Sequence, residues 1–154
     1  MENNVKRNVE FDGIFLTRNP LNQPYFDKQS VIDTFADDSC LMDRLRNYGV
    51  YGEFGTPVFP TLKGIERLKE MLHVSMEKTA FRIESVELEL HQKDDVEIFY
   101  PQATIVFCGP LANKLMENWG RIRFRPRVLS DRAGDSIYKM SRVITWDAIP
   151  ASIR

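Results

Sequence analysis

Alternation of apolar and polar residues predicts several extended strands. The clearest case is 79–90, TAFRIESVELEL, where Phe81 begins one alternating series and Val86 begins another of the opposite parity. Because successive side chains of a strand face opposite sides of a sheet, this phase change predicts a β-bulge near Glu84 and Ser85. Further strands are predicted over 11–17, 103–108, 120–129 and 138–149.

Helical spacing of apolar residues separates these strands. It predicts a helix capped by Ser30, a second one after Ser39, a third capped by Thr61, and a fourth stretch over 111–119. The third helix carries an apolar stripe made of Ile65, Leu68, Met71 and Leu72. Between the second and third helices, the glycine- and proline-rich 49–60, GVYGEFGTPVFP, is expected to be a loop or a sharply bent strand.

This order of elements predicts the fold class and the domain organisation. Strands separated by short helices, without a repeated strand–helix–strand unit, predict an α+β fold. We expect a mostly antiparallel small β-barrel or curved sheet with three or so short flanking helices, similar to the family named below. The polar residues 1–10 are expected to form a flexible N-terminal arm, and 11–154 a single domain.

Composition and charge narrow the function classes. The formal net charge of -1 gives no global attraction to nucleic acid or to an anionic membrane, so such binding would need a local patch. The sequence has no apolar run of about 18 residues and no secretory signal pattern. Cys40 and Cys108 are in neither metal-ligand nor redox spacing. We therefore expect a soluble intracellular protein with two buried thiols rather than a disulfide.

The one strong local patch is GRIRFRPRVL, 120–129. Four arginines alternate there with apolar residues: Arg121, Arg123, Arg125 and Arg127. A period of two places all four guanidinium groups on one face of a strand. Three uses stay open: ion pairs within the chain, for which Glu87 and Glu89 are candidates, contacts with an acidic protein partner, and contacts with the phosphates of a nucleic acid.

No metal or cofactor site is predicted. His73 and His91 are the only histidines, and no metal-ligand spacing accompanies them. The GEFGTP stretch lacks the lysine and the helix start of a phosphate-binding loop, and no serine lies in a GxSxG context. We therefore expect no cofactor.

Five stretches, taken in order, resemble the prohead maturation serine proteases of large tailed bacteriophages: NPLNQPYFD, GVYGEFGTP, SMEKTAFRIESVEL, RFRPRVL and VITWDAIPAS. The resemblance covers about residues 11 to 152. GEFGTP is similar to the "GELxHP" loop of that family, RFRPR to its "FSPR" strand, and VITWDAI to its "ITFDxV" strand. By this correspondence Thr56 stands at the position of the general-base histidine, Arg125 at that of the nucleophilic serine, and Asp147 at that of the supporting aspartate.

The resemblance implies an inactive relative, because the chemistry of those positions has changed. Acyl transfer needs a nucleophile activated by a nearby base. A threonine at 56 cannot accept a proton as imidazole does, and a guanidinium at 125 is neither nucleophile nor base. A relocated site at Ser130 is the enzymatic alternative, but Ser130 lies five residues from Arg125, about 16 Å along an extended strand.

We therefore expect a non-enzymatic phage structural or assembly protein that binds another protein. Its roles could be those of a capsid or decoration component, a prohead core protein, or a regulator that occupies a site of the protease. The expected location is the cytoplasm of the infected host cell, the virion, or both. Binding is expected through the four arginines, Glu53 and Phe54. The alternative is a nucleic-acid-binding or host-directed inhibitory protein that uses the Arg121 to Arg127 strand; a homo-oligomer stays open, and no membrane partner is expected.

Overall fold

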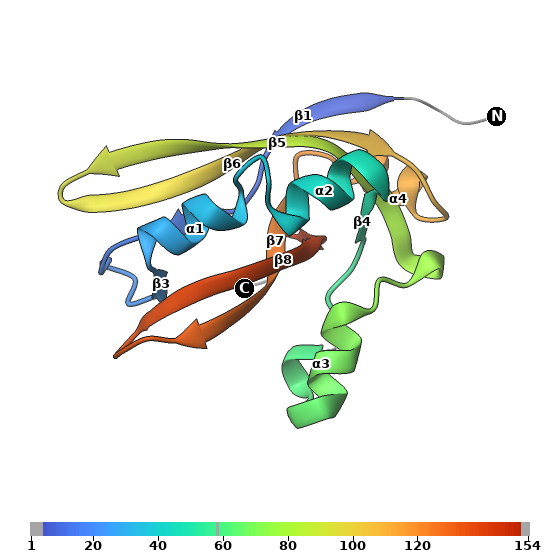
Figure 1. Ribbon diagram of the computed structural model, residues 1–154. Coiled ribbons are helices and arrows are strands. Elements are labelled where there is room, and N and C mark those ends of the chain that lie inside the picture. Colours follow the sequence, from blue (N-terminus) through green and yellow to red (C-terminus); the bar gives the residue numbers. More distant parts are fainter. Residues whose placement is uncertain (1–4, 58, 152–154) are drawn as a thin grey trace.

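The computed structural model describes residues 5–57 and 59–151, which form two β-sheets (Figure 1). The larger sheet has the order β1-β6-β5-β4, with β2 also paired to β6, and the smaller has the order β3-β8-β7. Only the short β3–β8 ladder is parallel among the described ladders. The strands are β1 Lys6–Glu10, β2 Ile14–Phe15, β3 Tyr25–Phe26, β4 Val50–Glu53, β5 Thr79–Lys93, β6 Val96–Phe107, β7 Ile122–Arg132 and β8 Ile137–Pro150.

Short helices fill the space between the sheets and flank them. They are α1 Lys28–Thr34, α2 Cys40–Asn47, α3 Gly64–Leu72 and α4 Ala112–Glu117, with 3₁₀ turns η1 Phe59–Thr61 and η2 Met76–Lys78. In Figure 1, α1 and α2 lie between the long β5–β6 hairpin and the β7–β8 hairpin, whereas α3 projects from the body of the molecule. Arg44 fastens α2 to β8 by donating hydrogen bonds to the carbonyls of Val143 and Ile144.

The predicted α+β fold with mostly antiparallel strands is confirmed. Of the two arrangements predicted for it, a small barrel or a curved sheet, the barrel is wrong. Within the described residues, β7 pairs only with β8, and the only β-bridge between the two sheets is parallel and joins Phe54, just after β4, to Ala148 on β8. The bridge does not extend into a ladder because the chain turns at Gly55, whose φ is 116°, and Pro57 then lacks an N–H donor. The two sheets therefore do not join into a closed barrel.

The local predictions have mixed outcomes. The β-bulge is confirmed, since the β5–β6 register shifts between Ile83 and Ser85. The first helix begins earlier than predicted because Asp27, not Ser30, accepts the capping hydrogen bond; the Ser30 hydroxyl instead bonds the backbone of Asp27 and Met140. The third helix begins at Gly64 rather than after Thr61, because 59–61 form the 3₁₀ turn η1.

The predicted flexible arm is wrong for residues 6 to 10. Lys6–Glu10 form strand β1, which pairs with β6 from Lys6 opposite Val106 to Glu10 opposite Gln102. Their polarity fits a sheet edge, where side chains of both faces reach solvent and charge discourages pairing with other chains. Residues 1–4 lie outside the described part of the chain.

Aromatic side chains make the centre of the core. Trp146 on β8 is fully buried, and its ring centroid lies 4.6 Å from that of Phe11 and 6.1 Å from that of Phe35. Phe124 on β7 meets Phe81 on β5 edge to face at 5.3 Å, so the core joins both sheets. The thiols are not part of it, because Cys40 is exposed and Cys108 is half-buried, so the prediction that both are buried is wrong. No disulfide joins the two cysteines.

The close approach of β4 to the core makes Gly52 a sensitive position. A Cβ atom at Gly52 would overlap the ring of Phe81, which is itself fully buried. We expect Gly52→Ala to lower the free energy of unfolding by about 1–3 kcal/mol through overpacking, as measured by urea unfolding. Replacing the phenyl ring with a smaller side chain in the double variant Gly52→Ala/Phe81→Leu should recover part of that loss, so that the two single losses are not additive. Strictly additive losses would show that the ring is not the obstacle.

Candidate functional site

A buried ion cluster links the two sheets at the position where the resemblance implies a catalytic aspartate. Arg127 on β7 and Asp147 on β8 are each 2% exposed at the side chain. The guanidinium donates from Nε and Nη2 to the two carboxylate oxygens of Asp147, each over 2.7 Å. Nη2 also lies 3.0 Å from Oε2 of Glu53, which accepts a hydrogen bond from the backbone N–H of Ser75. The Arg127–Asp147 ion pair is bidentate, and both side chains are closed to solvent.

The remaining donors of Arg127 hold the C-terminal end of α3. Nη1 donates to the carbonyls of His73 and Met71, over 2.9 and 3.3 Å, with Glu70 O at 3.4 Å. The guanidinium also stacks on Phe59 of η1, 5.4 Å from the ring centroid. An arginine has five N–H donors, and here every nitrogen has an acceptor. One side chain therefore ties β4, β8, η1 and α3 together.

Burial and charge act against each other within this cluster. Burial raises the pKa of Asp147, and the hydrogen bond and charge of Arg127 only partly oppose this effect. Burial alone would lower the pKa of Arg127, but its hydrogen bond to Asp147 and the charges of Asp147 and Glu53 outweigh burial and raise it. The guanidinium therefore stays charged, and its stabilising partners are carboxylates of the same chain.

The three positions assigned by the resemblance lie on neighbouring segments. Arg125 stands directly opposite Asp147 in the β7–β8 register. The residue before Thr56, Gly55, donates its N–H to the carbonyl of Ala148 over 2.9 Å. Thr56 and Arg125 are exposed, whereas Asp147 is buried and bonded to Arg127. The side chain that meets the aspartate is thus neither of the two that the resemblance places there.

The four arginines predicted to share one strand face have different surroundings in the structure. Arg121 precedes β7, Arg123 is paired with Asp12, and only Arg125 is exposed on the strand without a carboxylate partner among the described residues. Arg127 differs because the C-terminal end of α3 and Phe59 of η1 cover its guanidinium group. Periodicity indicates which face a side chain takes, but a covering segment decides whether that face is exposed.

Two further predicted binding residues lie inside the protein. Glu53 is 7% exposed and paired with Arg127, and Phe54 is half-buried against the core. Neither Arg127 nor Glu53 is available as an exposed binding residue. Ion pairing of arginines within the chain does occur, but the partners are Asp12, Glu53 and Asp147 rather than Glu87 or Glu89.

A cleft of about 620 Å³ lies next to the ion cluster, between α3, the short strands β2 and β3, and β7. Its lining includes the apolar side chains of Phe26, Phe59, Met71, Val128 and Met140. Arg67, Arg123 and Arg125 also line it, together with Ser130. Among the described residues, neither Arg67 nor Arg125 has a carboxylate partner. The cleft thus combines an apolar lining with two unpaired cations.

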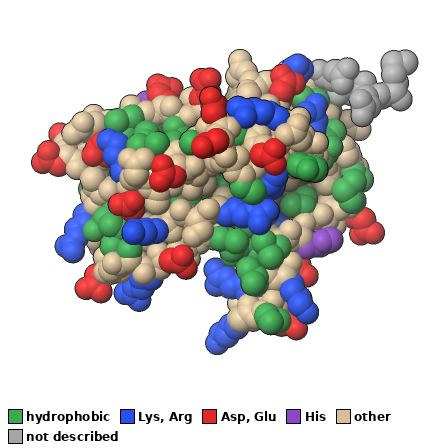
Figure 2. All heavy atoms as spheres, viewed as in Figure 1, with side chains coloured by type: hydrophobic (Ala, Val, Ile, Leu, Met, Phe, Trp, Pro, Cys, Tyr) green, Lys and Arg blue, Asp and Glu red, His purple; other side chains and the backbone are tan. Residues whose placement is uncertain are grey.

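The outer side of α3 adds apolar surface near this cleft. Of the stripe predicted for this helix, only Met71 is buried, while Ile65 is 68% and Leu68 42% exposed. Figure 2 shows hydrophobic side chains together with Lys and Arg on the projection that α3 forms. The helix itself is held by Arg127 rather than by a buried face.

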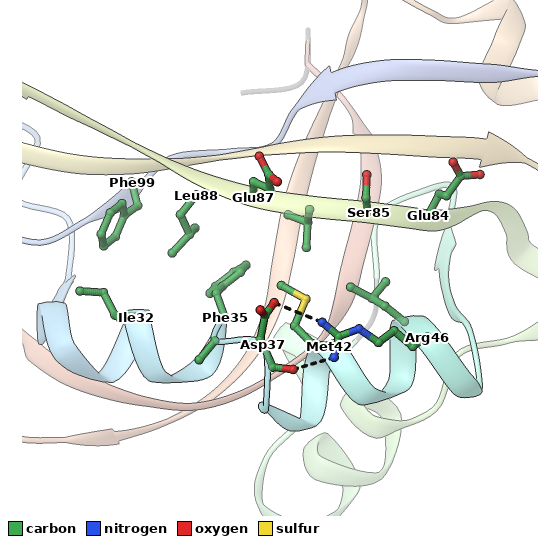
Figure 3. A pocket seen from close by; sticks show the side chains of 13 residues that line it. Ile32, Phe35, Asp37, Met42, Arg46, Glu84, Ser85, Glu87, Leu88 and Phe99 are labelled. Atoms are coloured by element: carbon green, nitrogen blue, oxygen red, sulfur yellow. Dashed lines mark hydrogen bonds and ion pairs between the residues drawn. The ribbon is translucent and has the colours of Figure 1, made fainter.

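A second groove, of about 560 Å³, lies between the first two helices and the β5–β6 hairpin (Figure 3). Ile32, Phe35, Leu88 and Phe99 point into it, and Asp37 bonds Arg46 at one end. Glu87 points away from the space between helices and strands. This groove offers apolar contacts without an unpaired cation, so the cleft beside Arg125 is the stronger candidate for a binding site.

Across 5–57 and 59–151, no group of three or more His, Cys, Asp or Glu side chains could hold a metal ion. None of the helices in this part of the chain is long and apolar enough to cross a bilayer.

Comparison of the chain with protein-family models, with curated proteins and with solved structures gave no match in any of the three. The resemblance to prohead proteases therefore rests on the five stretches of sequence alone.

Proposed function

We propose that this chain is a non-enzymatic phage structural or assembly protein, an inactive relative of the prohead proteases that binds another protein. The observation that supports it is the closed ion cluster. Asp147, at the position of the aspartate that would support a histidine, receives two hydrogen bonds from Arg127 instead. A carboxylate held in this way is directed at a guanidinium group rather than at an imidazole.

The neighbouring positions support the same conclusion. Thr56 and Arg125 are exposed near Asp147, and neither side chain can act as general base at neutral pH. Function belongs to the site rather than to the scaffold, so a protease-like scaffold with this site would serve binding. The phage setting comes from the resemblance, and the candidate roles are capsid or decoration component, prohead core protein and assembly regulator.

Particle association tests this proposal. In cells infected with the phage that carries this gene, we expect the protein to sediment with proheads, virions or both, as detected with an antibody across a sucrose gradient. An unrelated early phage protein of similar mass, which should stay at the top of the gradient, is the control. If the protein stayed there too at every time after infection, a structural or assembly role would be excluded.

The enzymatic alternative has its own readout. We expect no labelling of the purified protein by a fluorophosphonate probe, because no activated serine is proposed. Labelling that disappears in Ser130→Ala would instead establish a relocated nucleophile and overturn the non-enzymatic assignment.

A further inference from the structure

We infer that the cleft beside Arg125 binds an extended acidic segment of a partner protein, with carboxylates on Arg67 and Arg125 and apolar side chains between them. The inference names the partner chemistry of the site proposed above and rests on that function. It starts from the two unpaired guanidinium groups, which belong to different segments, α3 and β7. Arginine is suited to carboxylate ligands because its planar fork bonds both oxygens.

Carboxylates of the same chain neutralise Arg123 and Arg127 but not Arg67 or Arg125. Arg123 is committed to Asp12, and Arg127 to Asp147 and Glu53. Arg125 interacts with the buried Asp147 only through its charge, which acts to lower the pKa of that carboxyl group. An incoming carboxylate at Arg125 would therefore meet a cation that the fold has not neutralised.

The apolar lining argues for a peptide rather than a nucleic acid. Phe26, Met71 and Val128 offer contacts that aliphatic side chains can fill, and a volume of about 620 Å³ holds several of them. Phe59, which could otherwise stack on a base, already lies under the Arg127 guanidinium.

Side chains, not strand addition, must supply the recognition. Within the described residues β7 is the edge of its sheet, but Pro126 stands in the middle of that edge and has no N–H to donate. Two residues before Pro126, the backbone carbonyl of Phe124 already accepts a hydrogen bond from the backbone N–H of Asp12. A peptide lying here would therefore be selected by charge and apolar spacing.

The test uses the purified full chain and fluorescence anisotropy. The probe is a labelled peptide of alternating glutamate and leucine, and its matched control has glutamine in place of every glutamate. We expect wild type to bind the glutamate peptide at least ten-fold more tightly than the glutamine peptide, with affinity falling as salt rises. The double variant Arg67→Glu/Arg125→Glu should lose at least ten-fold in affinity.

Two controls separate this cleft from general charge effects. Arg132→Glu/Arg142→Glu makes the same change at two exposed arginines outside the cleft and should bind as wild type does. A lysine and leucine peptide should bind the Arg67→Glu/Arg125→Glu protein and not wild type, which shows that a folded cleft is present. Equal binding by both double variants would overturn the inference.

The remaining arms identify other occupants. An oligothymidylate that binds wild type more tightly than the glutamate peptide does, and loses binding in Arg67→Glu/Arg125→Glu, would assign the cleft to nucleic acid and overturn the inference. If the protein self-associates and Asp94→Lys/Asp95→Lys, at the tip of the β5–β6 hairpin, abolishes the association, the cleft would be assigned to a second copy of this chain. That result would overturn the inference of a different partner protein. Particle association without peptide binding would overturn the inference alone and leave the proposed function standing.

Discussion

Replacing Arg127 with methionine is expected to lower the free energy of unfolding by about 3–5 kcal/mol. The change would leave the carboxylates of Asp147 and Glu53 buried without their cation. It would also remove the donor from the carbonyls of Met71 and His73 and so release the end of α3. Breaking one partner of a buried ion pair costs this much because the remaining charge is desolvated without compensation.

Urea unfolding at pH 7, followed by tryptophan fluorescence, measures the loss. The matched control is Arg125→Met, which makes the same change two residues away at an exposed side chain and should stay within about 0.5 kcal/mol of wild type. Adding Asp147→Leu to Arg127→Met should recover part of the stability, because it removes one uncompensated charge. Equal losses at 125 and 127 would show that the cluster does not stabilise the fold.

Replacing Trp146 with alanine should also cost about 3–5 kcal/mol. The side chain is fully buried and packs between Phe11 and Phe35, so alanine would leave a large cavity in the middle of the core. The rings around it belong to different elements and cannot all move inward.

The conservative change at the same position separates packing from polarity. Among the described atoms, the indole Nε1 of Trp146 is buried without a hydrogen-bond partner, so Trp146→Phe removes an unsatisfied donor and most of the ring stays. We expect it to cost less than about 1.5 kcal/mol. Chemical unfolding followed by circular dichroism gives both values, with Trp119→Ala, at a half-buried ring, as the comparison. A loss for Trp146→Phe as large as that for Trp146→Ala would mean that the indole N–H is needed.

The ion cluster and the cleft that we propose as the binding site share the helix α3. Arg127 holds the end of α3, and α3 supplies Arg67 and Met71 to the cleft. Any change that releases the helix should therefore weaken peptide binding as well as stability. Variants at Arg67 and Arg125 act on the cleft alone, since both side chains are exposed.

Local pattern determined the long strands β5, β7 and β8, the β-bulge and the α+β class of this chain. These follow from the parity of neighbouring side chains, which a single strand reveals by itself, as in the shift between Ile83 and Ser85. The capping residues were less predictable, because Ser30 and Asp27 compete for the same few backbone groups and β8 settles the competition through Met140.

Only the tertiary structure decided which arginine is buried. Arg123, Arg125 and Arg127 share one parity in the sequence, yet they are respectively paired with Asp12, unpaired, and enclosed by α3. It also decided that the sheets stay open, since Gly55 turns the chain away after one bridge to Ala148. The physical reason is the same in both cases. Periodicity reports the face of a residue, whereas burial and ion pairing depend on segments that are distant in sequence and meet only when the chain folds, such as Arg127 and the end of α3.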